Sequence, residues 1–180
     1  DLAEGNSWQY LWLVPQDVEG LTRLMGGDDA FTRKLDSLFT AEGNMGAQAS
    51  SDISGLIGMY AHGNEPSHHV TYMYPFAGYQ WKTAEKVRQV MKAFYFDKPD
   101  GLAGNEDCGA MSSWYVFSSL GFYPENSASG IYVLGSPLFD KAVIKTGNKT
   151  FTVQTRGKSA ANIYIQRATL NAKPYRKSFI

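Results

Sequence analysis

The sequence predicts an α+β fold in which helices come first and a small antiparallel β region follows. Three observations predict it: apolar residues recur at helical spacing up to about residue 120, short β-branched and aromatic runs follow residue 130, and glycine and proline punctuate the change. We place the boundary near residue 125, with a helical part over 1–125 and a β-strand part over 126–180. A chain of 180 residues can bury a core of its own.

Amphipathic spacing predicts four helices of ordinary length, over residues 18–25, 28–39, 81–95 and 110–120. Gly26-Gly27 ends the first helix, and Asp28 and Asp29 can cap the second. Gly121, with Pro124 just beyond it, ends the last. Long polar loops join the helices, and such loops often carry function; they cover residues 41–52, 58–64 and 96–108.

Short runs of β-branched and aromatic residues predict strands over residues 131–134, 142–145, 150–155 and 162–169. Turn residues separate successive runs, as at 146–149 and 156–159. Short strands joined by such turns form hairpins, so we expect one small antiparallel sheet after the helices.

The composition argues against several classes of function. Formal net charge is zero and no run of like charges stands out, which argues against a nucleic-acid partner and an anionic membrane surface. No apolar stretch approaches the roughly 20 residues that cross a bilayer, so we expect no transmembrane segment. The single cysteine, Cys108, leaves no internal disulfide. The chain opens with Asp1 rather than Met, so we expect a fragment of a longer protein.

Three acidic segments lie next to predicted helices, at residues 4–10, 62–69 and 104–109. Each places carboxylates beside Gly and Asn, in backbone able to bend toward a ligand. Aspartate and asparagine before a helix are most often simple caps, so any one segment alone favours capping. Three such segments within the helical part favour a catalytic role, because a glycosidase uses two carboxylates that flank the bond it cleaves.

The surroundings of the acidic residues predict different roles for them. Pro66 suits the first position of a helix and puts Glu65 at the N-cap, and Asp107 also precedes a helix. A helix N-terminus stabilises negative charge, so these two carboxylates should stay ionised, as a general base or a calcium ligand must be. Glu4 has aromatic neighbours that would raise its pKa, as a general acid requires; they are Trp8, Tyr10 and Trp12.

The three histidines, His62, His68 and His69, invite comparison with a zinc site. Their spacing matches no HExxH pattern, adjacent histidines point to different faces of a helix, and the only cysteine lies elsewhere. Hydrogen bonds to sugar hydroxyls, or to the loop itself, are the better interpretation.

Three long motifs, in order along essentially the whole chain, resemble glycoside hydrolase family 92. The first is Glu4-Gly5-Asn6-Ser7-Trp8-Gln9-Tyr10, with Val14-Pro15-Gln16-Asp17. The second is Tyr60-Ala61-His62-Gly63-Asn64-Glu65-Pro66-Ser67-His68-His69. The third is Gly104-Asn105-Glu106-Asp107-Cys108-Gly109-Ala110-Met111-Ser112-Ser113-Trp114, followed by Gly121-Phe122-Tyr123-Pro124.

The resemblance implies a calcium-dependent exo-α-mannosidase that removes terminal α-linked mannose from glycans with inversion. It implies that the helical part belongs to an (α/α)6-barrel catalytic domain, completed by an N-terminal part of the same polypeptide. Glu4 then matches the general acid and Asp107 the general base. Asn64 and Glu65 would meet Ca²⁺ and substrate, and four residues would contact the sugar: Trp8, His62, His68 and Asn105. A secreted or periplasmic location is also implied.

Two positions depart from the family pattern. Some members have Asp where this chain has Asn105, so a role as base rests on Asp107 alone. Some members that cleave α-1,2 linkages carry an acid directly after the histidine that matches His62, where this chain has Gly63. Specificity for α-1,2 linkages is therefore in question, and α-1,3 linkages become an alternative.

Two other functions stay open at this point. Another (α/α)-toroid glycosidase, such as an inverting glucosidase, would share the paired acids and the aromatic residues. A carbohydrate-binding or structural fragment without catalysis is the alternative from a different class, because the five or six helices predicted in all, short ones included, are fewer than the roughly twelve of a complete toroid.

Overall fold

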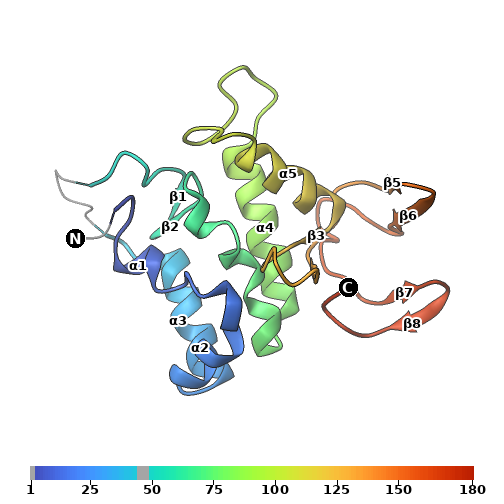
Figure 1. The fold of residues 1–180 in the computed structure, drawn as a ribbon, viewed down its shortest axis with the longest axis horizontal. Coiled ribbons are helices and arrows are strands. Elements are labelled where there is room, and N and C mark those ends of the chain that lie inside the picture. Colours follow the sequence, from blue (N-terminus) through green and yellow to red (C-terminus); the bar gives the residue numbers. More distant parts are fainter. Residues whose placement is uncertain (1–2, 44–48) are drawn as a thin grey trace.

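The computed structural model describes residues 3–43 and 49–180, with the helices grouped together and the two C-terminal β-hairpins extending from one side of them (Figure 1). The α-helices of this part of the chain are α1 (Ser7–Tyr10), α2 (Val18–Leu24), α3 (Asp28–Thr40), α4 (Gln80–Phe94) and α5 (Ala110–Leu120). Short 3-10 helices lie between them: η1 (Pro15–Asp17), η2 (Glu65–Ser67), η3 (Val70–Tyr72) and η4 (Tyr74–Ala77). The four predicted helices are confirmed, each within one residue of its predicted bounds.

The helix ends follow local chemistry. Gly121 ends α5 in the left-handed conformation, with φ of 97°, where a Cβ would be strained. The side chain of Asp17 accepts a hydrogen bond from the amide of Gly20 and so caps α2. At α3 the expected cap is wrong: Gly27 is the N-cap, and Asp28 lies within the first turn, where its charge still favours the helix dipole.

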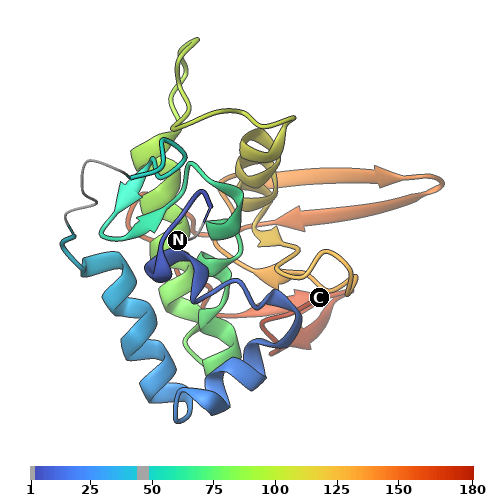
Figure 2. The same ribbon diagram turned by 60° about the vertical axis from the view of Figure 1, so that its left-hand side comes forward.

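The strands form separate antiparallel hairpins, not the single sheet that the sequence predicts. Among the described residues four pairs occur: β1 (Leu56–Ile57) with β2 (Tyr60–Ala61), β3 (Phe122–Tyr123) with β4 (Val133–Leu134), β5 (Lys141–Thr146) with β6 (Lys149–Gln154), and β7 (Ala168–Leu170) with β8 (Lys173–Tyr175). The turn predicted at 146–149 is confirmed by the pairing of Thr146 with Lys149. Figure 2 shows the β5–β6 hairpin projecting away from the helices.

Most of the strand predicted over 162–169 is absent, since only Ala168–Leu170 is extended and paired. The preceding residues bind elsewhere. The carbonyl of Ile163 accepts a hydrogen bond from Ser136 Oγ at 2.8 Å, and the hydroxyl of Tyr164 donates to Glu85 on α4. Residues 163 and 164 thus bond to residues distant in the sequence and do not pair with a neighbouring strand.

A core of aromatic and aliphatic side chains joins α3, α4 and α5 to the 3-10 segment between residues 65 and 77. Trp12, Phe31, Tyr74 and Trp114 are fully buried, and the rings of Trp12 and Phe31 meet edge to face with centroids 5.7 Å apart. Burying side chains of this size stabilises a fold by about 1.5–3 kcal/mol each. The second acidic segment, residues 62–69, therefore packs directly on this core.

In the described part of the chain, no helix is both long and apolar enough to span a bilayer. Residues 44–48 of the predicted 41–52 loop lie outside the described residues.

Candidate active site

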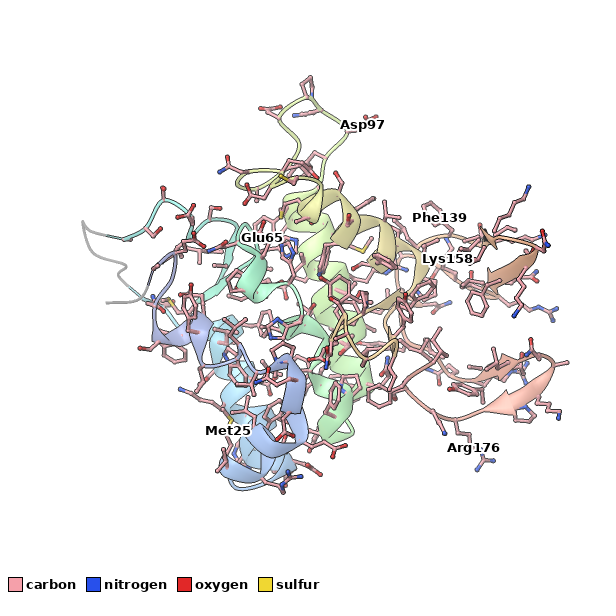
Figure 3. All side chains as sticks on the ribbon, viewed as in Figure 1. Met25, Glu65, Asp97, Phe139, Lys158 and Arg176 are labelled. Carbon is pink, nitrogen blue, oxygen red and sulfur yellow. The ribbon has the colours of Figure 1, made fainter. Side chains whose placement is uncertain are left out.

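The three acidic segments predicted from the sequence meet at one place. Asn64 Nδ2 donates a hydrogen bond of 2.9 Å to the carbonyl oxygen of Glu4. Asp107 and Glu4 also lie near enough to the Glu65 carboxyl for their negative charges to raise its pKa. We call Glu4, Glu65 and Asp107 the carboxyl cluster. Figure 3 shows Glu65 close to the ends of α4 and α5 from which the 96–108 loop rises.

Glu65 has the perturbed carboxyl of this cluster. Burial raises its pKa, and the negative charges of Asp107 and Glu4 raise it further, against a lowering by its own backbone amide. Glu65 is not the helix N-cap that the sequence predicts, and its pKa shifts upward, opposite to the lowering expected from a helix N-terminus. The N-cap is Asn64, and η2 is only three residues long, too short to carry a helix dipole.

Two members of the carboxyl cluster lie on unusual backbone. Glu4 and Asp107 have φ of 59° and 49°, and Cys108 next to Asp107 has φ of 56°. A non-glycine residue in this left-handed region costs about 1–2 kcal/mol. Such strain collects at functional positions, because a site demands a side-chain direction that relaxed backbone does not provide.

The side chain of Glu106, not that of Asp107, caps the N-terminus of α5. The two carboxylate oxygens of Glu106 accept hydrogen bonds from the amide and the hydroxyl of Ser112, at 3.0 and 2.9 Å. The N-cap residue of α5 is Gly109, and the first turn contains no acidic residue. The simple capping role that the sequence left open for Asp107 is thus taken by its neighbour.

A polar cavity of about 320 Å³ opens beside Asp107. Serine, acidic, amide and glycine residues line it: Ser51, Asp52, Ser54, Gly63, Gly104, Asn105 and Asp107. Asn105, for which the resemblance predicts substrate contact, is among these lining residues. Asp52 and Ser54 were missed as site residues, although the run of serines around Asp52 at the end of the 41–52 loop was a signal. The many hydroxyl, carboxylate and amide groups suit a polyhydroxylated ligand.

Glycines let three backbone segments touch at the floor of this cavity. A Cβ on Gly63 would lie 2.0 Å from Ser54 Oγ. A Cβ on Gly104 would lie 2.8 Å from both the Gly63 carbonyl oxygen and Ser54 Oγ. The amide of Gly63 also donates to the Ser54 carbonyl at 3.0 Å. We call Ser54, Gly63 and Gly104 the glycine junction; it holds together the segments that lead to Glu65 and Asp107.

His62 lies beneath the cluster and is fully buried, so its ring cannot line a sugar pocket as expected. Tyr95 Oη donates to the Met111 carbonyl at 3.0 Å, so it accepts from His62 Nε2 at 2.7 Å. Tyr60 Oη then donates to Nδ1 at 2.8 Å. Burial lowers the pKa of His62 to about 2, so the ring is neutral and structural.

His68 and His69 also serve the scaffold. Each donates from Nε2 to a carbonyl oxygen, His68 to His62 at 3.1 Å and His69 to Trp12 at 2.6 Å. Burial lowers both pKa values, that of His68 to about 4. Direct sugar contact by the buried His68 ring is therefore not supported. Across residues 3–43 and 49–180, no group of three His, Cys, Asp or Glu side chains could hold a metal.

The aromatic residues near Glu4 do not bury its carboxyl, which is exposed. Trp12 is fully buried in the core, and Tyr10 Oη donates to the Ala3 carbonyl. The half-buried Trp8 ring receives Lys34 Nζ at 4.2 Å from its centroid. The expected apolar surroundings of Glu4 are therefore absent from the described residues.

Comparison with known proteins identifies the family of this chain. The sequence profile of the glycosyl hydrolase family 92 catalytic domain matches residues 1–180. The chain belongs to glycoside hydrolase family 92. A family GH92 α-mannosidase from Bacteroides thetaiotaomicron, solved in complex with mannoimidazole, is 41% identical, with a TM-score of 0.91 over 98% of this chain and 23% of that one.

Two further relatives of this family 92 chain agree. A family GH92 inverting mannosidase from Bacteroides thetaiotaomicron VPI-5482 is 36% identical, with a TM-score of 0.84 over 99% of this chain and 25% of that one. A protein of Arthroderma benhamiae, described as an uncharacterized secreted glycosidase, is 35% identical over 98% of this chain and 21% of its own length. The chain thus spans about a quarter or less of these relatives.

The glycine junction of this family 92 chain can be tested with a matched pair of variants. Gly104 and Gly157 have similar left-handed backbone, with φ of 74° and 69°, but a Cβ at 157 meets nothing within 4 Å. We expect Gly157→Ala to lose about 1 kcal/mol of unfolding free energy and Gly104→Ala about 3 kcal/mol, because only the second also forces atoms apart. Urea denaturation measures both. Equal losses would mean that the three segments are not tightly packed.

Proposed function

We propose that the full-length protein removes terminal α-linked mannose from glycans by single displacement with inversion, and that this chain carries both catalytic carboxylates. Glu4 is the general acid that protonates the glycosidic oxygen, and Asp107 is the general base that activates water on the opposite face of the sugar. Relatives described as a mannosidase bound to mannoimidazole and as an inverting mannosidase support the reaction and its inversion, and the roles of Glu4 and Asp107 rest on the family resemblance.

One observation carries the proposal: three acidic segments meet at one place, and Asp107 of one of them lines a polar cavity. Asp107 is released from helix capping by Glu106 and lines that cavity. Inversion requires two carboxyl groups roughly 6.5–9.5 Å apart, so that water fits between the base and the sugar. The cavity beside Asp107 offers room for that water or for part of the sugar.

Glu65 is the competing candidate for the acid, because its carboxyl has the raised pKa that a proton donor needs. Glu4 is favoured by the family resemblance and Glu65 by its surroundings. The two assignments predict different behaviour in variants, so the choice between them is experimental.

We also propose that Ca²⁺ binds at Asn64 and Glu65. Their oxygens are the hard ligands that Ca²⁺ prefers, and no soft ligand set lies among the described residues near them. Ca²⁺ takes six to eight oxygens, so the remaining ligands would come from the rest of the polypeptide and from sugar hydroxyls. A bound cation would supply positive charge beside three carboxylates, which would lower the pKa of Glu65.

The environment of the full-length protein follows from the same relatives. The protein would act outside the cytoplasm, secreted or periplasmic, as the secreted Arthroderma relative suggests. The helical part would belong to an (α/α)6 toroid completed by the rest of the polypeptide. Without that part, this chain would retain the carboxyl cluster but lack a complete sugar site, so an inactive or merely binding fragment is the alternative.

The catalytic pair is tested by substituting each carboxylate in the full-length protein. Glu4→Gln should slow natural mannosides by about 10²–10⁴-fold and spare an aryl mannoside whose acidic phenol leaves without protonation. Asp107→Asn should slow both substrates alike, because attack by water is impaired whatever leaves. Steady-state kcat/KM on the two substrates measures this. If Glu4→Gln slows both equally while Glu65→Gln spares the aryl substrate, the acid is Glu65.

Calcium dependence is tested by chelation of the full-length protein. We expect a chelator to abolish mannoside hydrolysis and added Ca²⁺ to restore it. Asn64→Ala should raise the Ca²⁺ concentration needed for half-maximal recovery by about tenfold or more, because one oxygen ligand is removed. Restoration by Zn²⁺ and not by Ca²⁺ would contradict the assignment.

A further inference from the structure

Tyr95 lies at the base of the loop that carries Asp107. It is the C-cap residue of α4, and it forms an isolated antiparallel bridge with Leu102. The loop over residues 96–108 rises from this point and leads to α5 (Figure 1). Tyr95 is therefore placed where the loop with the third acidic segment joins the helices.

The hydroxyl of Tyr95 joins the second acidic segment to the helix that follows the third. Tyr95 Oη accepts a hydrogen bond from His62 Nε2 at 2.7 Å and donates one to the Met111 carbonyl at 3.0 Å. His62 precedes Asn64 by two residues, and Met111 follows Asp107 by four, in the first turn of α5. One oxygen atom thus links the backbone that leads to Asn64 with the backbone that follows Asp107.

Packing fixes the Tyr95 ring independently of its hydroxyl. The ring stacks on Trp114, with centroids 5.8 Å and planes 10° apart, and its centroid lies 4.7 Å from that of Tyr115. Phenylalanine at this position would keep these ring contacts and remove both hydrogen bonds. The buried Nε2 of His62 would lose the acceptor it has here, and an unsatisfied buried donor is costly, so the two segments would shift to satisfy it.

We propose that Tyr95 is a positioning residue for the general base: its hydroxyl fixes the spacing between the second and third acidic segments, and with it the place of Asp107. The inference rests on the proposed function, in which Asp107 activates water. Reacting groups must be held within about 0.5 Å of the productive geometry, so a small shift of this segment would slow the reaction. Trp114 Nε1 also ties α5 to the second segment, through the His68 carbonyl at 2.9 Å, but the Tyr95 bond acts nearer to Asp107 along the chain.

The test compares Tyr95→Phe with Tyr72→Phe in the full-length protein. Tyr72 is the matched control, because its hydroxyl also donates a buried hydrogen bond to α5, to Ser118 Oγ at 2.8 Å, but near the far end of that helix. We expect Tyr95→Phe to lower kcat about 10- to 100-fold with little change in KM, equally for a natural and an aryl mannoside, because attack by water is impaired. Tyr72→Phe should turn over both substrates as the unmodified protein does.

Crystal structures of the same two variants give a readout that does not depend on catalysis. Asp107 should move relative to Glu65 by about 0.5–1 Å in Tyr95→Phe and keep its place in Tyr72→Phe. An unmoved Asp107, or equal losses of kcat in the two variants, overturns the proposal. A loss confined to the natural mannoside also overturns it, because that pattern belongs to the general acid. If the unmodified protein releases no mannose, or α-mannose first, the proposed function fails, while the crystallographic comparison still decides whether Tyr95 positions Asp107.

Discussion

The meeting of three carboxyl groups is the constraint on which the rest of this structure depends. Glu4, Glu65 and Asp107 come from separate segments, and within the described residues no cation pairs with any of them. Desolvation and mutual repulsion oppose such a cluster, and the raised pKa of Glu65 reports that cost. The cluster persists because uncharged contacts bring the segments together: the bond from Asn64 to the Glu4 carbonyl, and the glycine junction below the cavity.

Rigidity behind the carboxyl cluster comes from a buried layer of rings. His62 receives a hydrogen bond from Tyr60, donates one to Tyr95, and packs edge-on against Trp114 with centroids 4.3 Å apart. Because every polar atom of this ring is satisfied and burial keeps it neutral, the layer fixes the backbone that leads to Asn64 without adding charge. Neighbouring residues thus differ in their surroundings: Asp107 lines the cavity, while His62, His68 and His69 are buried and bonded within the scaffold.

The helices could be predicted because each carries its own start, period and stop within a short stretch, as Gly121 shows for α5. The absence of a strand at 162–167 could not be predicted from local sequence, because these residues bond to side chains distant in the sequence, such as Ser136. The cluster itself was predictable from acidic residues beside glycine and asparagine. The raised pKa of Glu65 was not predictable, because it depends first on burial and then on the approach of Asp107 and Glu4 in space. The burial of His62 was likewise not predictable, because it depends on side chains that are distant in the sequence.

The central claim is that this carboxyl cluster performs a single displacement, with water activated by Asp107. The most direct measurement is proton NMR of mannose released by the full-length protein from an α-mannoside, recorded before the anomers equilibrate. Single displacement predicts that β-mannose forms first and α-mannose appears only later by mutarotation. Initial release of α-mannose would contradict it, because retention requires a carboxylate nucleophile and leaves no role for Asp107 as the base of a single displacement.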